Sequence, residues 1–333
     1  MARTGRWPRR ASPSGILETM AGAHPRILFV GTVLEGRRCL EALIEAGERP
    51  SAIVTLDPAL ARLTSGWVPF DDIAASLGVP LVAVRDLNTE ENVELVAALH
   101  PDLILVIGWT RLLGRAVLRL PPLGSVGFHA SLLPRYRGRA PVNWAIINGE
   151  RETGNTMFFL DEGVDTGDII DQRRIPIEDG DDCATLYEKV AAAGIEMLLV
   201  HLPALKAGRA PRSPQDEFAA TVMPRRRPQD GRIDWGQDAR SLFNWVRALT
   251  HPYPGAFTHH GGRRLFVWRA MPGDAATDAL PGRLVEGADG SVQVATGSGT
   301  LRLASVQWDG EVEADARILR QLVGLTFEHE EVR

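Results

Sequence analysis

An alternation of short apolar runs with amphipathic segments constrains the fold of this chain more than any other feature. Residues 26–30 form a mostly apolar run that ends at Gly31, and leucine or isoleucine then recurs at helical spacing at positions 40, 43 and 44, before Gly47. The same pattern predicts further strands at residues 52–55, 81–84 and 103–107, and helices at residues 71–77 and 90–99. Such alternation predicts a mainly parallel α/β sheet with helices on both faces.

The turns that follow these strands are the places to look for a ligand site, because parallel sheets bind ligands at the carboxyl ends of their strands. The first turn, residues 31–36, reads GTVLEG and lacks the G-x-G-x-x-G spacing that brings backbone amides to a pyrophosphate. A dinucleotide site is therefore not expected. Trp109 follows the predicted strand 103–107, where its ring could stack on a planar ligand or cap the sheet as a core side chain.

The second half of the chain predicts a smaller domain of different architecture. A long helix at residues 182–205 is followed by a stretch rich in proline, arginine and aspartate, which we interpret as a linker. A helix at residues 239–249, short strands separated by glycine turns and a final helix at residues 313–323 predict a small β-barrel-like domain. The predicted divisions are a tail (residues 1–24), an N-terminal domain (25–208), a linker (209–230) and a C-terminal domain (231–333).

Charge and cysteine content narrow the functional class. The 333 residues carry a formal net charge of −5, which disfavours polyanions except at a local patch. The two cysteines, Cys39 and Cys183, fit neither a disulfide framework nor a metal-binding spacing, so we expect a cytoplasmic location and no metal. No apolar run approaches the roughly 20 residues of a membrane span, so no membrane partner is expected. Residues 1–24 have arginines but no apolar segment, and we expect a disordered tail, with Met20 as an alternative initiator.

Two residues in the middle of the chain could carry acid and base chemistry. His129 ends a predicted strand at residues 125–129, where an imidazole could exchange a proton with a ligand near neutral pH. Asp165 lies on a loop bounded by Gly163 and Gly167, which could bring its carboxylate beside the imidazole and favour the protonated ring. Each residue also has a plain structural interpretation, as a strand-end histidine bonded to backbone and as a carboxylate that stabilises a turn. Composition and spacing leave these alternatives open.

Four motifs give the chain a resemblance to a known family. Residues 129–141 read H-x-S-L-L-P-x-Y-R-G-x-A-P, followed by W-A-I-x-x-G at 144–149, T-G-x-T at 153–156 and D-x-G-D-I at 165–169. With these motifs the chain resembles the 10-formyltetrahydrofolate-dependent formyltransferases, whose members act on amino-sugar nucleotides or on methionyl-tRNA. The resemblance extends from about residue 25 to the C-terminus. It implies a Rossmann-like catalytic domain at 25–208 and the family's barrel-like second domain at 231–333.

The resemblance also implies a reaction and a set of site residues. The reaction is transfer of a formyl group from 10-formyltetrahydrofolate to an amine, without a metal. His129 would be the general acid and base, and Asp165 would tune it. The residues implied in binding the folate cosubstrate are Trp109, Arg111, Leu112, Leu113, Ser131, Leu132, Leu133, Pro134, Arg139, Asp161, Glu162, Gly163, Val164 and Asp165.

Position 127 departs from the family pattern. The family has an asparagine two residues before the histidine, which donates a hydrogen bond to the developing oxyanion, whereas this chain has Gly127. Losing one such donor typically lowers turnover about 100-fold to 1,000-fold. Three interpretations are open. In the first, another donor replaces it, such as a backbone amide, an ordered water or the side chain of Asn143, Asn155 or Ser131. In the second, the substrate carries its own donor. In the third, the chain binds folate or an amine without transferring the formyl group.

We expect the acceptor to be a small amine, a nucleotide-linked amino sugar. The tRNA-modifying enzymes of the family carry a lysine-rich insertion after the second strand, whereas residues 57–67 of this chain contain one positive and one negative charge. Methionyl-tRNA is the alternative acceptor, because Arg225, Arg226 and Arg227 form a basic concentration that could bind phosphates. The same arginines can also be interpreted as part of a solvated linker.

Overall fold

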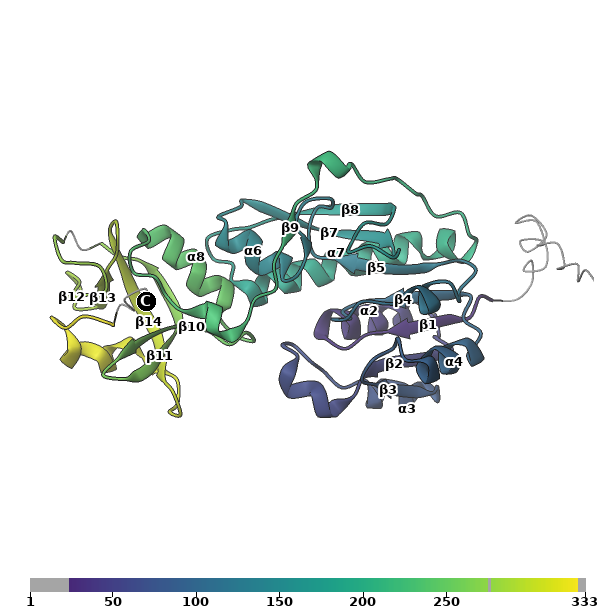
Figure 1. Ribbon diagram of the computed structural model, residues 1–333, viewed down its shortest axis with the longest axis horizontal. Coiled ribbons are helices and arrows are strands. Elements are labelled where there is room, and N and C mark those ends of the chain that lie inside the picture. Colours follow the sequence, from purple (N-terminus) through teal and green to yellow (C-terminus); the bar gives the residue numbers. More distant parts are fainter. Residues whose placement is uncertain (1–23, 275–276, 329–333) are drawn as a thin grey trace, which may run out of the picture.

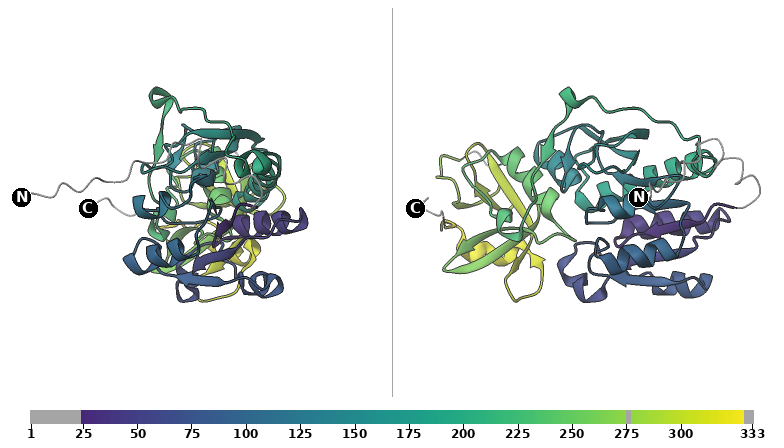
Figure 2. Two further views of the ribbon diagram at one scale, coloured as in Figure 1. Left: turned by 90° about the vertical axis from the view of Figure 1, so that its right-hand side faces the viewer. Right: turned by 45° about the vertical axis from the view of Figure 1, so that its right-hand side comes forward.

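The computed structural model describes residues 24–274 and 277–328. A larger lobe built on a seven-stranded sheet and a smaller lobe built on a six-stranded antiparallel sheet lie side by side (Figure 1), and Figure 2 shows the same arrangement from two further directions. The helix α8 (Ala239–Leu249) lies between them and packs on α6 (Pro141–Ile147) of the larger lobe and on the smaller sheet. The predicted tail lies outside the described residues, except for His24.

The sheet of the larger lobe has the strand order β3-β2-β1-β4-β5-β7-β8. Strands β1 to β5 pair in parallel, whereas β7 and β8 run antiparallel to their neighbours. The prediction of a mainly parallel sheet is therefore confirmed. The strands are β1 (Ile27–Val30), β2 (Ala52–Leu56), β3 (Leu81–Val84), β4 (Leu103–Val106), β5 (Ser125–His129), β7 (Glu152–Phe159) and β8 (Ile169–Pro176).

Helices cover both faces of this sheet, as predicted. Phe29 belongs to a core shared with α2, α3 and α7, whereas its neighbour Leu28 packs with α4 and α5 on the opposite face. The two side chains separate in this way because successive residues of a strand point to opposite faces. The bounds are α2 (Leu34–Glu45), α3 (Asp71–Leu77), α4 (Glu90–Ala98), α5 (Arg115–Leu118) and α7 (Cys183–Lys206), with a 3-10 helix η1 at Pro58–Leu63. Within the described part of the chain, no helix is long and apolar enough to cross a membrane.

The smaller lobe is a curled antiparallel sheet with the strand order β10-β11-β14-β13-β12, and β15 pairs with β14. Its core contains the stacked rings of Trp235 and Phe327, whose centroids lie 5.6 Å apart. The strands are β10 (Ala256–His260), β11 (Arg263–Pro272), β12 (Leu284–Glu286), β13 (Val292–Ala295), β14 (Thr300–Trp308) and β15 (Ala314–Asp315).

The final helix predicted at residues 313–323 is wrong in its bounds and type. Ala314 and Asp315 pair with β14, so the chain is extended there. A 3-10 helix, η4 (Ala316–Leu322), begins only after them, with the Asp315 carboxylate accepting a hydrogen bond from the Arg317 backbone N–H. The Asp315 cap therefore sets the start of the helix, which a periodicity of apolar residues does not show.

The segment predicted as a linker carries structure of its own. It contains the 3-10 helices η2 (Glu217–Ala219) and η3 (Pro228–Gly231) and the short strand β9 (Val222–Met223), which pairs in parallel with β6 (Arg137–Gly138). Figure 1 shows the chain passing from the end of α7 over the larger lobe to β9. The segment thus reaches the strand that follows the His129 turn.

Candidate active site

The structure brings the two predicted acid and base residues together at the carboxyl end of β5. His129 is buried, and its Nδ1 lies 3.5 Å from Oδ2 of Asp165. Its Nε2 lies 2.7 Å from the backbone oxygen of Tyr136, to which it must donate because a carbonyl oxygen can only accept. Both ring nitrogens therefore face oxygen atoms, and the proton that the ring can exchange belongs on Nδ1.

The backbone around this pair adopts left-handed conformations that side chains other than glycine rarely occupy. Tyr136, Ala140 and Asp165 have φ values of 59°, 52° and 56°, and only one other non-glycine residue of the described chain, His100, has a positive φ. Such conformations are held by their surroundings and concentrate at functional sites. At Gly167 a Cβ would lie 1.8 Å from the backbone oxygen of Phe159, so only glycine fits at this turn of the Asp165 loop.

The segment predicted as a linker holds the Asp165 loop in place. Nothing in the sequence indicated this role. Gln215 donates from Nε2 to the backbone oxygens of Asp165 and Gly167, at 2.9 and 2.8 Å. Arg137, which is buried, donates in turn to Oε1 of Gln215 and to the carboxylate of Glu217. The Asp165 carboxylate also accepts a hydrogen bond from the Gly138 backbone N–H at 2.8 Å. Two separate segments, β6 and residues 215–217, therefore fix the position of the carboxylate that faces His129.

His129 lies on the wall of a cavity of about 250 Å³ at this edge of the sheet. Ten of the predicted site residues line it, namely Trp109, Arg111, Leu112, Leu113, Gly127, His129, Arg139, Asp161, Gly163 and Asp165. Trp109 brings an indole N–H that is buried and has no hydrogen-bond partner among the described residues. Apolar side chains beside an unused donor suit a planar, polar heterocycle such as a pterin. These residues therefore fit the folate cosubstrate that the resemblance implies.

Six of the predicted folate contacts do not line this cavity, and the structure gives them other surroundings. The hydroxyl of Ser131 donates to the backbone oxygen of Arg135 at 2.7 Å, and Leu132 packs against Gly154 of β7. Leu133 is buried and Pro134 accepts a hydrogen bond from Thr221, so the turn 131–134 supports the wall from behind. Glu162 pairs with Arg115 and Arg119, and Val164 is exposed. Both point away because the Asp165 loop turns only Asp161, Gly163 and Asp165 toward the cavity.

Gly127 needs no special backbone, and the three side chains considered as substitute donors are engaged elsewhere. Gly127 lies within β5, where it pairs with Val106 and Phe158. The donating nitrogen of Asn143 contacts the Ala248 oxygen at 2.6 Å, and that of Asn155 contacts the Val190 oxygen at 2.9 Å. Ser131 donates to Arg135, as described above. None of the three is free to replace the family's asparagine.

Two further polar side chains line the cavity that sequence reasoning missed, Glu35 of α2 and Tyr187 of α7. Burial raises the pKa of Glu35 to about 7, and a hydrogen bond from Asn155 opposes this shift only in part. Burial also raises the pKa of the Tyr187 hydroxyl, which accepts a hydrogen bond from Tyr253. The sequence contained one signal for Glu35, namely an acidic residue just past the end of β1. Ligands of parallel sheets bind at that carboxyl edge.

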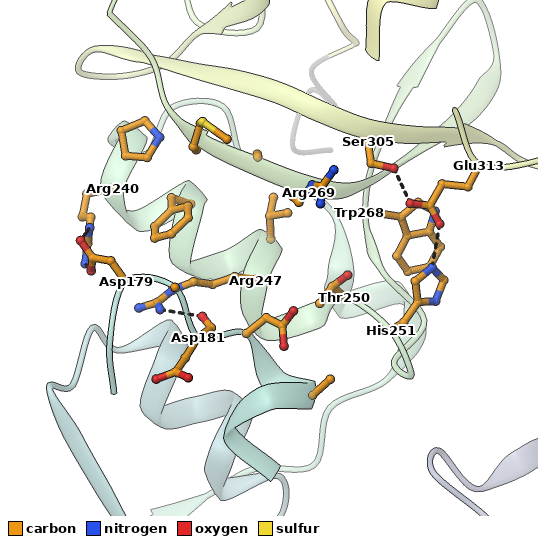
Figure 3. A pocket seen from close by; sticks show the side chains of 18 residues that line it. Asp179, Asp181, Arg240, Arg247, Thr250, His251, Trp268, Arg269, Ser305 and Glu313 are labelled. Carbon is orange, nitrogen blue, oxygen red and sulfur yellow. Dashed lines mark hydrogen bonds and ion pairs between the residues drawn. The ribbon is translucent and has the colours of Figure 1, made fainter. Parts of the chain in front are cut away.

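A larger cavity, about 790 Å³, lies between α8, the N-terminal end of α7 and the smaller sheet (Figure 3). Several of its polar side chains have partners. Arg240 pairs with Asp179, Arg247 donates to the backbone oxygens of Glu178 and Asp181, and His251 pairs with Glu313. None of the predicted site residues lies there, so the smaller cavity is the candidate active site. No group of side chains suited to holding a metal ion occurs among the described residues.

Comparison with known proteins places this geometry in a family. Residues 52–202 match the formyl transferase family, and residues 226–321 match the formyl transferase C-terminal domain. A methionyl-tRNA formyltransferase of Citrifermentans bemidjiense is 36% identical over 288 residues, which are 86% of this chain and 90% of that protein. The chain belongs to the formyl transferase family. It is thus a formyltransferase, as the motifs at 129–169 predicted.

Two solved structures share the fold of this formyltransferase. HypX from Aquifex aeolicus in complex with tetrahydrofolic acid has a TM-score of 0.64 and 22% identity over 89% of this chain, which spans 47% of the HypX chain. WlaRD, a sugar 3N-formyl transferase studied in the presence of dTDP and 5-N-formyl-THF, has a TM-score of 0.59 and 15% identity, covering 87% of this chain and all of its own. At these identities the likeness concerns the fold alone.

Proposed function

We propose that this formyltransferase moves a formyl group from 10-formyltetrahydrofolate to a primary amine. The observation that carries the proposal is the buried His129 on the cavity wall, held between the Asp165 carboxylate and the Tyr136 backbone oxygen. With Nε2 bonded to a backbone oxygen, Nδ1 is the ring atom that can take and return a proton during acyl transfer. The cosubstrate supplies the formyl carbon when it is bound.

Each residue has a role that follows from its position. His129 takes or gives a proton at Nδ1, and Asp165 orients the ring and stabilises its charge. The wall for the pterin is formed by Trp109, Leu112 and Leu113. Arg139 lies on another segment and is tied to this wall by a hydrogen bond that it donates to the backbone oxygen of Thr110.

The acceptor that the relatives support best is methionyl-tRNA. The Citrifermentans bemidjiense enzyme bears that name, and it matches both lobes of this chain at 36% identity. The expectation of a small acceptor rested on charge alone. We therefore place methionyl-tRNA first.

A nucleotide-linked amino sugar is the second candidate, and the distribution of charge favours it. The net charge of −5 repels a polyanion, and residues 57–67 lack a basic insertion. Arg226 is also not free for phosphates, because its guanidinium is held between the rings of Trp144 and Trp245, at 5.0 and 4.6 Å from their centroids.

One experiment tests the function and separates these acceptors. The purified protein is mixed with 10-formyltetrahydrofolate and either methionyl-tRNA or a panel of amino-sugar nucleotides, and formylated product is measured by mass spectrometry. We expect product with one acceptor class, its loss in His129→Ala, and a reduced rate in Asp165→Asn because the imidazolium is less stabilised. Folate binding should survive in both variants. Binding of folate without product from any acceptor would contradict transfer and support a binding protein.

A further inference from the structure

Glu35 is a carboxyl group on the wall of the active-site cavity that the mechanism above does not use. It lies in the first turn of α2, and its side chain lines the same cavity as His129. Its hydrogen bond comes from Asn155 Nδ2 at 3.4 Å, and no cation of the described chain pairs with it. Glu35 is half-buried, and a partly desolvated carboxylate without a cationic partner in a ligand cavity indicates a place for a cation.

The side from which Glu35 enters differs from that of the predicted folate wall. Phe128 faces α7, because a Cβ at Gly194 would lie 3.8 Å from its ring and 3.1 Å from Asn155 Nδ2. Gly127 and His129, one residue to either side in β5, point to the opposite face. Glu35, which is hydrogen-bonded to Asn155, therefore approaches from the α2 and α7 side of the sheet.

The folate wall belongs to the other face. Trp109, Leu113 and Leu160 pack with the core beneath α4 and α5, and a Cβ at Gly127 would meet Leu160. The cavity therefore has two walls that differ in chemistry. One carries aromatic and apolar side chains together with His129, and the other carries the Glu35 carboxyl group and the Tyr187 hydroxyl.

We propose that Glu35 binds the acceptor amine and removes its first proton. The inference rests on the proposed function, since it assumes that an amine is formylated in this cavity. The ligand class is a primary amine, which is an ammonium ion at neutral pH and must lose a proton before its nitrogen can attack. Glu35 thus serves the amine from the wall opposite His129.

The step conserves protons and electrons. The ammonium nitrogen gives one proton to Glu35, and its lone pair then forms the bond to the formyl carbon. The bond from that carbon to the folate nitrogen breaks. The amine loses its second proton, and His129 Nδ1 relays a proton to the folate nitrogen. Tetrahydrofolate and the formamide leave, and Glu35 returns its proton to solvent.

The surroundings of Glu35 set the pH at which it can act. The groups that face it are Cys39 from α2, Tyr187 from α7 and Asn155 from β7, with His129 and Asp165 across the cavity. With its pKa raised to about 7, Glu35 is protonated below that pH and cannot accept the amine's proton. Acceptor turnover should therefore fall as the pH drops through 7.

The test compares Glu35→Gln with Glu41→Gln, a matched change on the same helix whose side chain pairs with Arg37 outside the cavity. For Glu35→Gln we expect kcat/KM for methionyl-tRNA or a UDP-linked amino sugar to fall at least 10-fold at pH 7.5. The inflection near pH 7 should disappear, while the Kd for 5-formyltetrahydrofolate stays close to wild type and the melting temperature does not fall. Unchanged kcat/KM, or an equal loss of folate affinity, would overturn the assignment.

A second measurement separates this inference from the proposed function. The carboxyl carbon of Glu35 is followed by carbon-13 NMR in the wild-type protein, with Glu35→Gln to assign the signal, while methionyl-tRNA or the UDP-linked amino sugar is added. A bound ammonium should lower the pKa of Glu35 whether or not a formyl group is transferred. A wild type that binds folate and shows this shift without product would refute transfer alone. A wild type that forms product with no shift would refute the role of Glu35 alone.

Discussion

At the scale of single residues, Gly127 departs from the family pattern, and the structure shows which atoms surround this position. The space that a side chain would take is occupied, because a Cβ at this position would lie 2.9 Å from Cδ2 of Leu160 and 3.2 Å from the Val106 oxygen. No positive φ stands in the way of another residue. The neighbour that must move is the end of an apolar side chain, so the obstacle can be removed by mutation.

We expect Gly127→Asn alone to lose about 1–3 kcal/mol of stability, because it forces Leu160 out of its position. The double variant Gly127→Asn, Leu160→Ala has room for the amide, which can then donate to the oxyanion. Its turnover should exceed that of Leu160→Ala alone by about tenfold or more. Steady-state kinetics and thermal melts of all four proteins in this cycle measure the coupling. A double variant slower than Leu160→Ala would show that glycine suits the true acceptor.

Glu35 gives a prediction for stability as well as for catalysis. Its folded pKa of about 7 lies above its ordinary value of 4.5, so the folded state binds its proton more tightly than the unfolded state. The stability that this proton contributes is complete below pH 4.5 and is lost as the pH rises through 7. Glu35→Gln should match wild type at pH 5 and exceed it at pH 8 by up to about 3 kcal/mol, since one pKa unit corresponds to about 1.4 kcal/mol. Urea unfolding at both pH values checks this, and a difference independent of pH would contradict it.

At the scale of elements, the segment between the two sheets is bonded to the larger lobe at the candidate active site. Residues 213–223 bond to the Asp165 loop through Gln215, to the His129 turn through Thr221 and to β6 through β9. Thr221 accepts a hydrogen bond from the Tyr136 backbone N–H, next to the carbonyl that contacts His129. The segment therefore supports both partners of the histidine.

Gln215→Ala should reduce turnover about 10-fold or more while leaving KM for the acceptor nearly unchanged. The variant loses two hydrogen bonds that hold the left-handed Asp165 backbone, and small displacements of a catalytic group are costly. Phe218→Ala in the same segment is the control, because that ring is fully exposed. Equal effects of the two variants on kcat would show that the segment acts only through general stability.

The contrast between His129 and Gln215 shows what the sequence could predict. Periodicity located β1 to β5 because a buried strand and an amphipathic helix leave local patterns. The motif around His129 is contiguous, and its resemblance to a family supplied the partner Asp165. Gln215 lies 50 residues from Asp165 in a stretch without periodicity, so nothing local marks it. Glu35 is an ordinary choice for the first turn of a helix, and only the fold shows that it faces a cavity.

At the scale of the whole molecule, several arginines of the smaller lobe are paired with acidic neighbours. Arg263 pairs with Glu311, Arg302 with Asp289 and Arg317 with Asp315. With a net charge of −5, the molecule has little long-range attraction for a polyanion. An enzyme of this kind that used methionyl-tRNA would have to recognise it through few phosphates and through the aminoacyl end.

This distribution of charge predicts weak tRNA binding with a shallow dependence on salt. Each neutralised phosphate contributes roughly 0.7 to 0.9 to the slope of log K against log salt, so two or three contacts give a slope of about −2 to −3. Filter binding of initiator tRNA between 50 and 300 mM KCl should give micromolar or weaker affinity near physiological salt. Arg225→Ala, at an exposed arginine, should change the slope by less than one unit if the linker stays solvated. Submicromolar affinity with a steep slope, lost in part in Arg225→Ala, would contradict this prediction and favour a tRNA-binding surface at the start of the smaller lobe.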